Sequence, residues 1–202
     1  EAIQLSRRYL AQVPDDTLGW QILAASRYLS GESKAALRAW NKTGRPIVDL
    51  VRVDGLRAVR FGIVADAIGV PHGRVLTPAG LGLARRRVED IPALRRSVVD
   101  YHPVEGGRVE LRAAVVERPV VGRPLPLLAS GALRALTMRE VGVSFASPTG
   151  GGERWLAAWR WEHANPRVRG RVDLPVRLGV IGVISVEGAW ERFRFSLDSA
   201  PG

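Results

Sequence analysis

The chain has 202 residues, of which 46% are hydrophobic and 25% are charged, and it carries a formal net charge of +10. This length and apolar content suffice for packed cores and exclude a disordered chain. Cysteine is absent, which excludes disulfides and thiolate metal sites. The sequence also has no run of about eighteen apolar residues that would form a transmembrane helix.

Arginine supplies nearly all of the positive charge, since Lys34 and Lys42 are the only lysines among 30 basic residues. A basic excess is typical of proteins that bind nucleic acid or an anionic membrane surface. The arginines are scattered through the whole chain, however, and the clusters at 85–87 and 95–96 have no interleaved aromatic residues on which bases stack. The sequence favours a solvated arginine-rich surface, and we expect no nucleic-acid partner.

The first 44 residues predict short helices, interrupted at Pro14–Asp16 and near Gly31. Each helix has one apolar stripe: Ala2, Leu5, Tyr9 and Leu10, then Leu18, Ile22, Ala25 and Leu29, then Ala35, Ala36, Ala39 and Trp40. This pattern resembles a tetratricopeptide repeat that begins at Thr17. The residues at the signature positions of that family are Pro14, Trp20, Leu23, Ala24, Ala36 and Trp40.

The resemblance to tetratricopeptide repeats is incomplete. Arg27 stands where the family prefers tyrosine, and no proline occurs where the repeat should end. The resemblance implies either a groove for protein partners or a purely structural spacer. Because such repeats usually occur in groups of three or more, it also leads us to expect further repeats before Glu1.

Residues 48–91 predict a strand followed by two helices. The strand spans Val48–Val53, and a helix follows with Phe61, Val64, Ala65 and Ile68 on its apolar side and a stop signal at Gly69. In the second helix Thr77 is the expected N-cap, Pro78 occupies the first position, and Pro92 ends the helix. The apolar stripe of the second helix comprises Leu81, Ala84, Val88 and Ile91.

A hairpin is predicted next, with strands at Ser97–His102 and Arg108–Val116. The connecting Glu-Gly-Gly offers two residues that tolerate positive φ. The second strand alternates Val109, Leu111, Ala113 and Val115 with Arg108, Glu110 and Arg112, which is typical of a half-buried strand.

The order strand, helix, helix, strand, strand over residues 48–119 resembles a POTRA (polypeptide-transport-associated) domain. Val51–Gly55, Gly69–Thr77 and Val116–Pro119 resemble its first turn, its inter-helix loop and its closing valine-glutamate. The resemblance implies that extended polypeptide adds to the free edge of the second strand, whose residues are Ser97, Val98, Val99, Asp100, Tyr101 and His102. Val99 and Tyr101 would supply apolar contact, with Arg95 and Arg96 near one end. The alternative is that these residues serve hairpin packing alone.

Residues 120–136 predict a linker with a short helix, and residues 137–202 predict antiparallel strands. Three strands are expected at 140–145, 154–162 and 167–174. A fourth is expected at about 183–195, with a bulge after Trp190 where the apolar positions change parity. One face of each strand is apolar and rich in tryptophan, while the other is charged. That pattern fits outer-membrane barrel strands and equally a soluble sheet with one solvated face.

The order of the segments favours the barrel interpretation. In the outer-membrane assembly and secretion family that includes the Bam and Tam barrels, POTRA domains immediately precede a barrel. Four strands cannot close a transmembrane barrel, so we expect further strands beyond Gly202. The predicted fold class is α+β multidomain, with a helical segment at 1–45, a POTRA-like domain at 46–119, a linker at 120–136 and an antiparallel β segment at 137–202.

Catalytic signatures are absent from the sequence. His72, His102 and His163 lie in different segments, without paired carboxylates at ligand spacing. We therefore expect no enzymatic activity, no metal and no cofactor.

The expected function is polypeptide transport in the bacterial cell envelope, across the periplasm and outer membrane. The expected partners are unfolded outer-membrane or secreted polypeptides, outer-membrane lipid along the β segment, and proteins bound by the helical repeat. The alternative is a soluble adaptor or division-type scaffold without a membrane barrel.

Overall fold

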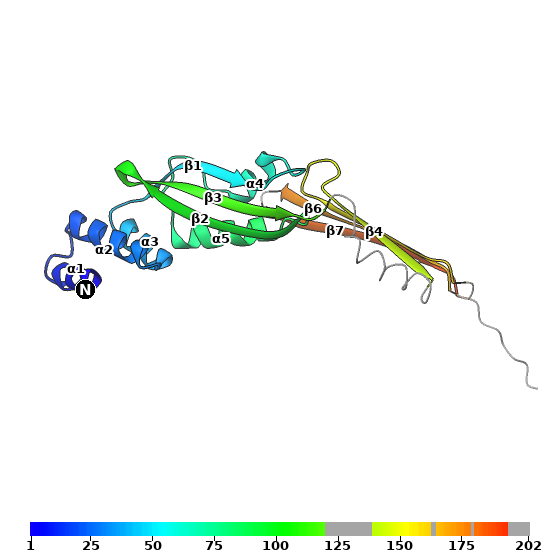
Figure 1. Ribbon diagram of the computed structural model, residues 1–202, viewed down its shortest axis with the longest axis horizontal. Coiled ribbons are helices and arrows are strands. Elements are labelled where there is room, and N and C mark those ends of the chain that lie inside the picture. The colour runs from blue at the N-terminus through cyan, green and yellow to red at the C-terminus, as the bar shows by residue number, and fades with distance from the viewer. Residues whose placement is uncertain (120–138, 163–164, 179, 194–202) are drawn as a thin grey trace, which may run out of the picture. The chain divides into compact units, whose positions relative to one another are not determined.

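The computed structural model describes residues 1–119, 139–162, 165–178 and 180–193. These residues form two compact units, and Figure 1 labels their elements. The first unit comprises 1–55, 64–89 and 97–115, and the second comprises 56–63, 90–96 and the chain from Val116 onward. The expected linker at 120–136, His163 and the end of the predicted fourth strand lie outside the described residues.

Three helices open the first unit: α1 (Ala2–Gln12), α2 (Thr17–Leu29) and α3 (Ser33–Asn41). Asp16 fixes the start of α2, because its carboxylate accepts the backbone N–H groups of Leu18 at 3.1 Å and Gly19 at 2.9 Å. The small core of these helices consists of Leu10, Leu23, Ala24 and Ala39, with Trp20 and Trp40 packed against it. The apolar stripe predicted for the second helix is wrong: Leu18, Ile22, Ala25 and Leu29 are exposed, and α2 turns Leu23 and Ala24 toward the core instead. The predicted helices are confirmed, and their assignment to a tetratricopeptide repeat stays a prediction.

The strand and helix order predicted for residues 48–119 is confirmed. The elements are β1 (Ile47–Asp54), α4 (Phe61–Ile68), α5 (Pro78–Glu89), β2 (Leu94–Val104), the short 3-10 turn η1 (Glu105–Gly107) and β3 (Arg108–Glu117). Thr77 caps α5, since its Oγ1 accepts the N–H of Gly80 at 3.0 Å. Gly106 and Gly107 have φ of 73° and 71°, as the predicted hairpin turn requires. Strand β2 starts three residues before the predicted Ser97, so Arg95 and Arg96 lie within it.

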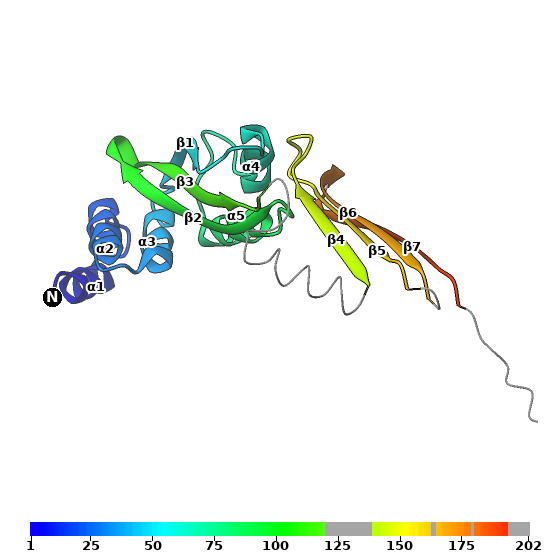
Figure 2. The same cartoon turned by 45° about the vertical axis from the view of Figure 1, so that its right-hand side comes forward.

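The sheet order is β1-β3-β2, with β1 parallel to β3. Val109, Leu111 and Ala113 of β3 are fully buried, whereas Arg108 and Arg112 are exposed, as predicted. Glu110, predicted on the same face as these arginines, is itself buried, with ion pairs of 3.1 Å to Arg52 and to Arg112. The apolar residues of α4 and α5, including Val64, Leu81 and Val88, are buried as well; these helices therefore cover the apolar face of the sheet, as Figure 2 shows. Among the described strands β2 has a neighbour on one side alone, which makes it an edge.

Four strands form the sheet of the second unit: β4 (Glu140–Ala146), β5 (Arg154–Arg160), β6 (Arg167–Leu178) and β7 (Val180–Glu191). They pair in sequence order, and every pair is antiparallel. Strand β6 extends four residues beyond the predicted end at Leu174, through Pro175. Pairing with β5 has already ended at Asp173, so the missing N–H of Pro175 costs no hydrogen bond on that side.

The bulge predicted after Trp190 does not occur within β7, and Phe195, the second residue of the predicted parity change, lies outside the described residues. Pairing of β6 with β7 runs without a shift from Leu178↔Val180 to Arg167↔Glu191. Strand β7 ends at Glu191, so Phe193 follows the strand and does not mark a change of face within it. No helix among the described residues combines the length and apolar character needed to cross a bilayer.

Candidate polypeptide-binding edge and two-faced sheet

The sheet of β4–β7 has one apolar face. Residues that pair directly across neighbouring strands point to the same face. One such row is Phe145, Trp155, Val172 and Val186, and another is Val141, Trp159, Val168 and Trp190. Within these rows Trp159 is 54% exposed, Trp190 58% and Val186 60%. The described part of the chain therefore leaves an aromatic, apolar sheet face uncovered.

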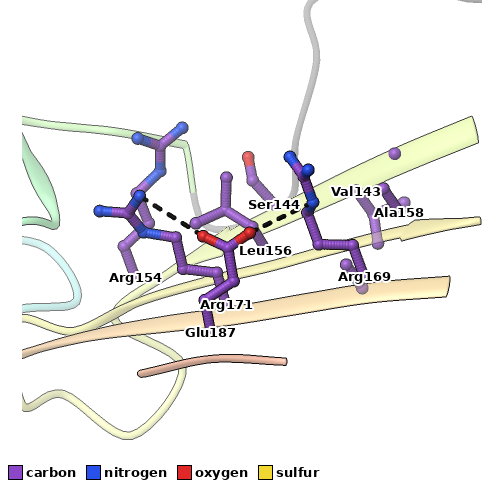
Figure 3. Close-up of a pocket in the computed structure, with 10 residues that line it drawn as sticks. Val143, Ser144, Arg154, Leu156, Ala158, Arg169, Arg171 and Glu187 are labelled. Atoms are coloured by element: carbon purple, nitrogen blue, oxygen red, sulfur yellow. Dashed lines mark ion pairs between the residues drawn. The ribbon is translucent and has the colours of Figure 1, made fainter. Parts of the chain in front are cut away.

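The opposite face of the same sheet carries a ladder of ion pairs. Arg160 lies 2.8 Å from Glu140, Arg169 3.2 Å from Glu187, and Arg171 2.8 Å from Asp173. Figure 3 shows the Glu187 carboxylate between Arg169 and Arg171, along a groove of about 450 Å³. The two faces thus have opposite chemistry, one uncovered and apolar, the other charged and internally paired.

The loop between β4 and β5 is a turn that hydrogen bonds to its own side chains hold together. Glu153 Oε1 accepts the N–H of Thr149 at 2.7 Å, and Ser147 Oγ accepts the N–H of Gly152 at 3.0 Å. Burial raises the pKa of the Glu153 carboxyl, but the donors of the turn, led by the Thr149 N–H, outweigh it and hold that pKa below its usual value. This turn is pre-organised by its own side chains.

The same loop binds two segments of its own unit. The N–H of Arg60 donates to Gly150 O at 3.0 Å, and the N–H of Ala93 donates to Gly152 O at 3.0 Å. A Cβ on Gly152, whose φ is +76°, would lie 3.1 Å from both Ile63 and Ile91. The close approach and the positive φ together favour glycine at position 152.

Glu117, at the end of β3, binds the segment that immediately precedes α4. Its carboxylate accepts the backbone N–H groups of Arg57 at 2.8 Å, Ala58 at 2.9 Å and Val59 at 3.0 Å. Burial raises the pKa of Glu117, but these three donors and the charge of Arg57 hold it below its usual value. In the sequence, Glu117 is recognisable as the glutamate of the valine-glutamate pair that resembles the end of a POTRA domain. The sequence does not indicate the three N–H groups that donate to it.

The predicted edge residues divide between the two faces of β2. Val99 and Tyr101 are each 2% exposed and belong to the core, so their side chains do not offer the apolar contact that the resemblance implied. Val98 is 54% exposed, and Asp100 and His102 are exposed on the same face. Arg95 and Arg96 are exposed, and Ser97 is half-buried. Within the segment Ser97–His102, any apolar side-chain contact with a bound peptide therefore falls to Val98.

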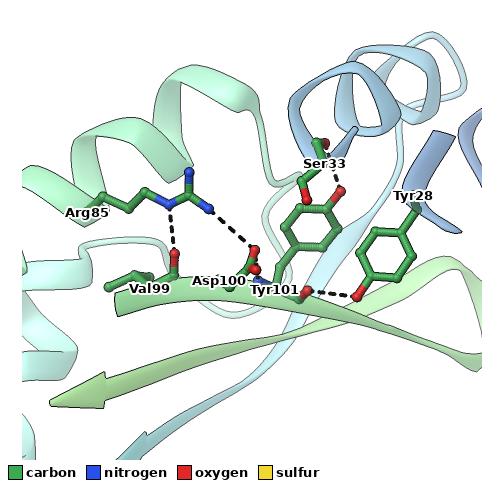
Figure 4. Close-up of polar contacts among 6 residues, drawn as sticks. All are labelled: Tyr28, Ser33, Arg85, Val99, Asp100 and Tyr101. Atoms are coloured by element: carbon green, nitrogen blue, oxygen red, sulfur yellow. Dashed lines mark hydrogen bonds and ion pairs between the residues drawn. The ribbon is translucent and has the colours of Figure 1, made fainter. Parts of the chain in front are cut away.

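Side chains from two helices reach the backbone of β2, as Figure 4 shows. Arg85 of α5 donates through Nε to Val99 O at 2.7 Å, and Tyr28 of α2 donates through its hydroxyl to Tyr101 O at 3.3 Å. The carboxylate of Asp100 accepts the N–H of Tyr101 at 2.9 Å. Sequence reasoning missed Arg85 and Tyr28, because nothing in their local pattern indicates a contact with β2.

Tyr101 also holds helix α3 through an aromatic cluster. Its hydroxyl donates to Ser33 O at 2.8 Å, and its ring centroid lies 5.4 Å from that of Tyr28 and 6.3 Å from that of Trp40. Burial, together with Tyr28 and Asp100, raises the pKa of the Tyr101 hydroxyl. The hydroxyl therefore stays protonated at physiological pH and keeps its role as donor.

Other reactive side chains are dispersed. His72 Nδ1 lies 2.7 Å from Asp49 O in a loop, while His102 lies on β2. Within the described ranges, no three or more His, Asp or Glu side chains gather in a way that would hold a metal ion.

The described residues thus combine a β-α-α-β-β module with a four-stranded antiparallel sheet that has one apolar and one charged face. No protein-family model matches the chain, and no curated protein matches it. One structural neighbour is the crystal structure of BamA from Haemophilus ducreyi lacking POTRA domains 1–3, with a TM-score of 0.48 and 13% identity over 73% of this chain and 28% of that chain.

Two CdiB structures are also similar. CdiB from Escherichia coli has a TM-score of 0.46 and 14% identity over 73% of this chain and 28% of its own. CdiB from Acinetobacter baumannii has a TM-score of 0.44 and 9% identity over 66% of this chain and 26% of its own. The chain therefore spans about a quarter of the length of these solved structures.

Proposed function

We propose that the chain belongs to a component of outer-membrane protein assembly or secretion. In this proposal the β-α-α-β-β module receives unfolded polypeptide in the periplasm by strand addition and passes it to a barrel, of which β4–β7 are four strands. The observation that carries the proposal is the uncovered apolar face of β4–β7, set against an ion-paired opposite face.

Lipid is the environment that best suits the apolar face. Soluble monomers rarely leave large contiguous apolar patches in water. A strand that crosses a bilayer needs about 9–11 residues; β6 and β7 have 12 residues each and meet this length, whereas β4 and β5 have 7 each. Tryptophan is favoured at membrane interfaces, where its ring is buried and its N–H stays wet. The charged face would then line the water-filled interior of the barrel, with its arginines already paired.

The module supplies the polypeptide-binding part of the proposal. An exposed edge offers N–H and C=O groups to an extended chain, and this pairing depends little on the sequence that binds. Strand β2 is such an edge among the described strands. Its residues Ser97–His102 are the proposed site, with Val98 as the exposed apolar contact and Arg95 and Arg96 as flanking cations.

The proposal is tested by measuring how strongly the 202-residue chain binds to lipid vesicles. Two matched variants on strand β7 are compared with the wild type. Val186 lies on the apolar face, whereas Val183 pairs with Pro175 on the charged face. A lipid-facing arginine costs up to about 2–4 kcal/mol, so Val186→Arg should reduce vesicle binding tenfold or more. Val183→Arg should leave it nearly unchanged. Equal effects of the two variants, or a wild-type chain that stays monomeric in water without lipid, would favour the soluble adaptor.

A further inference from the structure

We propose that α2 and α5 latch the outer edge of β2, so that the helical segment α1–α3 and an incoming polypeptide compete for the same backbone groups. The inference rests on the proposed strand addition and adds a regulatory contact to it. Its elements are the hydroxyl of Tyr28, the guanidinium of Arg85 and the carbonyls of Val99 and Tyr101.

The parity of the strand places both carbonyls on the outer side of β2. The N–H and C=O of one residue point to the same side of a strand, and those of the next residue point to the other side. Val99 and Tyr101 therefore direct their backbone groups to a common side. Helices α2 and α5 supply the donors on that side, so it faces away from β3.

An added strand would bond every second residue of this edge, which means Ser97, Val99 and Tyr101. Two of these three carbonyls already accept a side-chain donor, and the N–H of Tyr101 already donates to Asp100. Pro103, the next outward-facing position, has no N–H. Pairing beyond Ser97 thus requires Arg85 and then Tyr28 to leave.

Release of Tyr28 affects more than one hydrogen bond. Its ring packs 6.0 Å from Trp40 and 5.4 Å from Tyr101, and the Tyr101 hydroxyl holds the first residue of α3, Ser33. A strand that displaces Tyr28 must therefore loosen the contact of α2 with β2. By linkage, whatever strengthens that contact must weaken strand addition by the same factor.

Fluorescence anisotropy of a labelled ten-residue peptide of alternating threonine and valine measures the competition. Tyr28→Phe keeps the ring and removes the donor, while Arg85→Gln removes the guanidinium. Each variant should raise peptide affinity about threefold and the double variant about tenfold, as expected from loss of one or two competing hydrogen bonds. The matched control for Arg85→Gln is Arg86→Gln, at an exposed residue of the same helix, and it should not change the affinity.

Amide hydrogen exchange provides a second measurement on the same proteins. Saturating peptide should speed exchange in α2 and α3 of the wild-type chain, and Tyr28→Phe should do so without peptide. If the wild type and both variants bind with equal affinity, the latch is refuted while the proposed function stands. If neither the wild type nor the double variant binds any peptide, strand addition at β2 and the latch fail together. Peptide binding by the double variant but not by the wild type supports both strand addition at β2 and the latch.

Discussion

Replacing Glu117 with glutamine tests whether this carboxylate fastens the chain that precedes α4. The side chain keeps its shape, but it loses its charge and turns an NH₂ group toward a backbone N–H. In the wild type Oε1 accepts from Arg57 and Val59 and Oε2 from Ala58, at 2.8–3.0 Å. Hydrogen bonds to a charged partner contribute about 1.5–3 kcal/mol each. Because one oxygen remains, we expect Glu117→Gln to lower the free energy of unfolding by about 2 kcal/mol.

The loss should depend on pH. The pKa of Glu117 lies below its ordinary value of 4.5, so its contribution is fully present above that value and disappears as pH falls through the folded-state pKa. The difference between wild type and Glu117→Gln should therefore be largest near neutral pH and shrink in acid. For a chain of this length, about 2 kcal/mol corresponds to a fall in Tm of roughly 4–8 °C.

Chemical and thermal unfolding, followed by far-ultraviolet circular dichroism between pH 3.5 and 7.5, give the free energy of unfolding and the Tm. The control is Glu89→Gln on the exposed surface of α5, which should change the free energy of unfolding by less than about 0.5 kcal/mol. A Glu117→Gln loss that is independent of pH, or no larger than that of Glu89→Gln, would refute the assigned role of the three N–H donors.

Three further predictions follow from single positions. Gly152→Ala should lower the free energy of unfolding by about 1–3 kcal/mol, because the added Cβ meets two isoleucine side chains at positive φ; thermal unfolding measures this, and Gly188→Ala, with open space around it, is the control. Val99→Pro removes an outward-facing N–H together with a buried side chain, so it should weaken peptide binding in the anisotropy assay and also lower stability. Asp100→Pro removes an N–H that faces β3 and should mainly reduce stability, by about 3 kcal/mol. Thr77→Ala should cost about 1 kcal/mol in the same unfolding assay through loss of the α5 cap.

Local patterns account for most of the elements. The stripe Leu81, Ala84 and Val88, the Thr77 cap and the two glycines of the hairpin each specify structure within a few residues, and each prediction matches the structure. The errors occur where packing between elements decides the outcome. In α2 it is Leu23 and Ala24, not the predicted stripe, that face the neighbouring helices. Pro175 stays inside β6 because β7 alone pairs there, which no pattern within β6 reveals.

The candidate site was predicted less completely than the fold. The resemblance identified the segment 97–102, but strand parity placed Val99 and Tyr101 in the core. The residues that contact the edge lie far away in sequence: Tyr28 is 73 positions from Tyr101, and Arg85 is 14 from Val99. Contacts of such long range depend on the packed tertiary structure, so a single sequence does not disclose them.

The modest strength of the proposed latch suits an edge that must be both protected and usable. A bare edge strand pairs with any extended chain and promotes aggregation, so leaving β2 open at all times carries a hazard. Each neutral hydrogen bond contributes about 1 kcal/mol net, and one to a charged donor such as Arg85 somewhat more. Two such contacts therefore block weak, transient pairing. A longer extended polypeptide gains several backbone hydrogen bonds as well as contact with Val98, and that gain exceeds what it must displace. The latch would then select for length and extended conformation rather than for sequence.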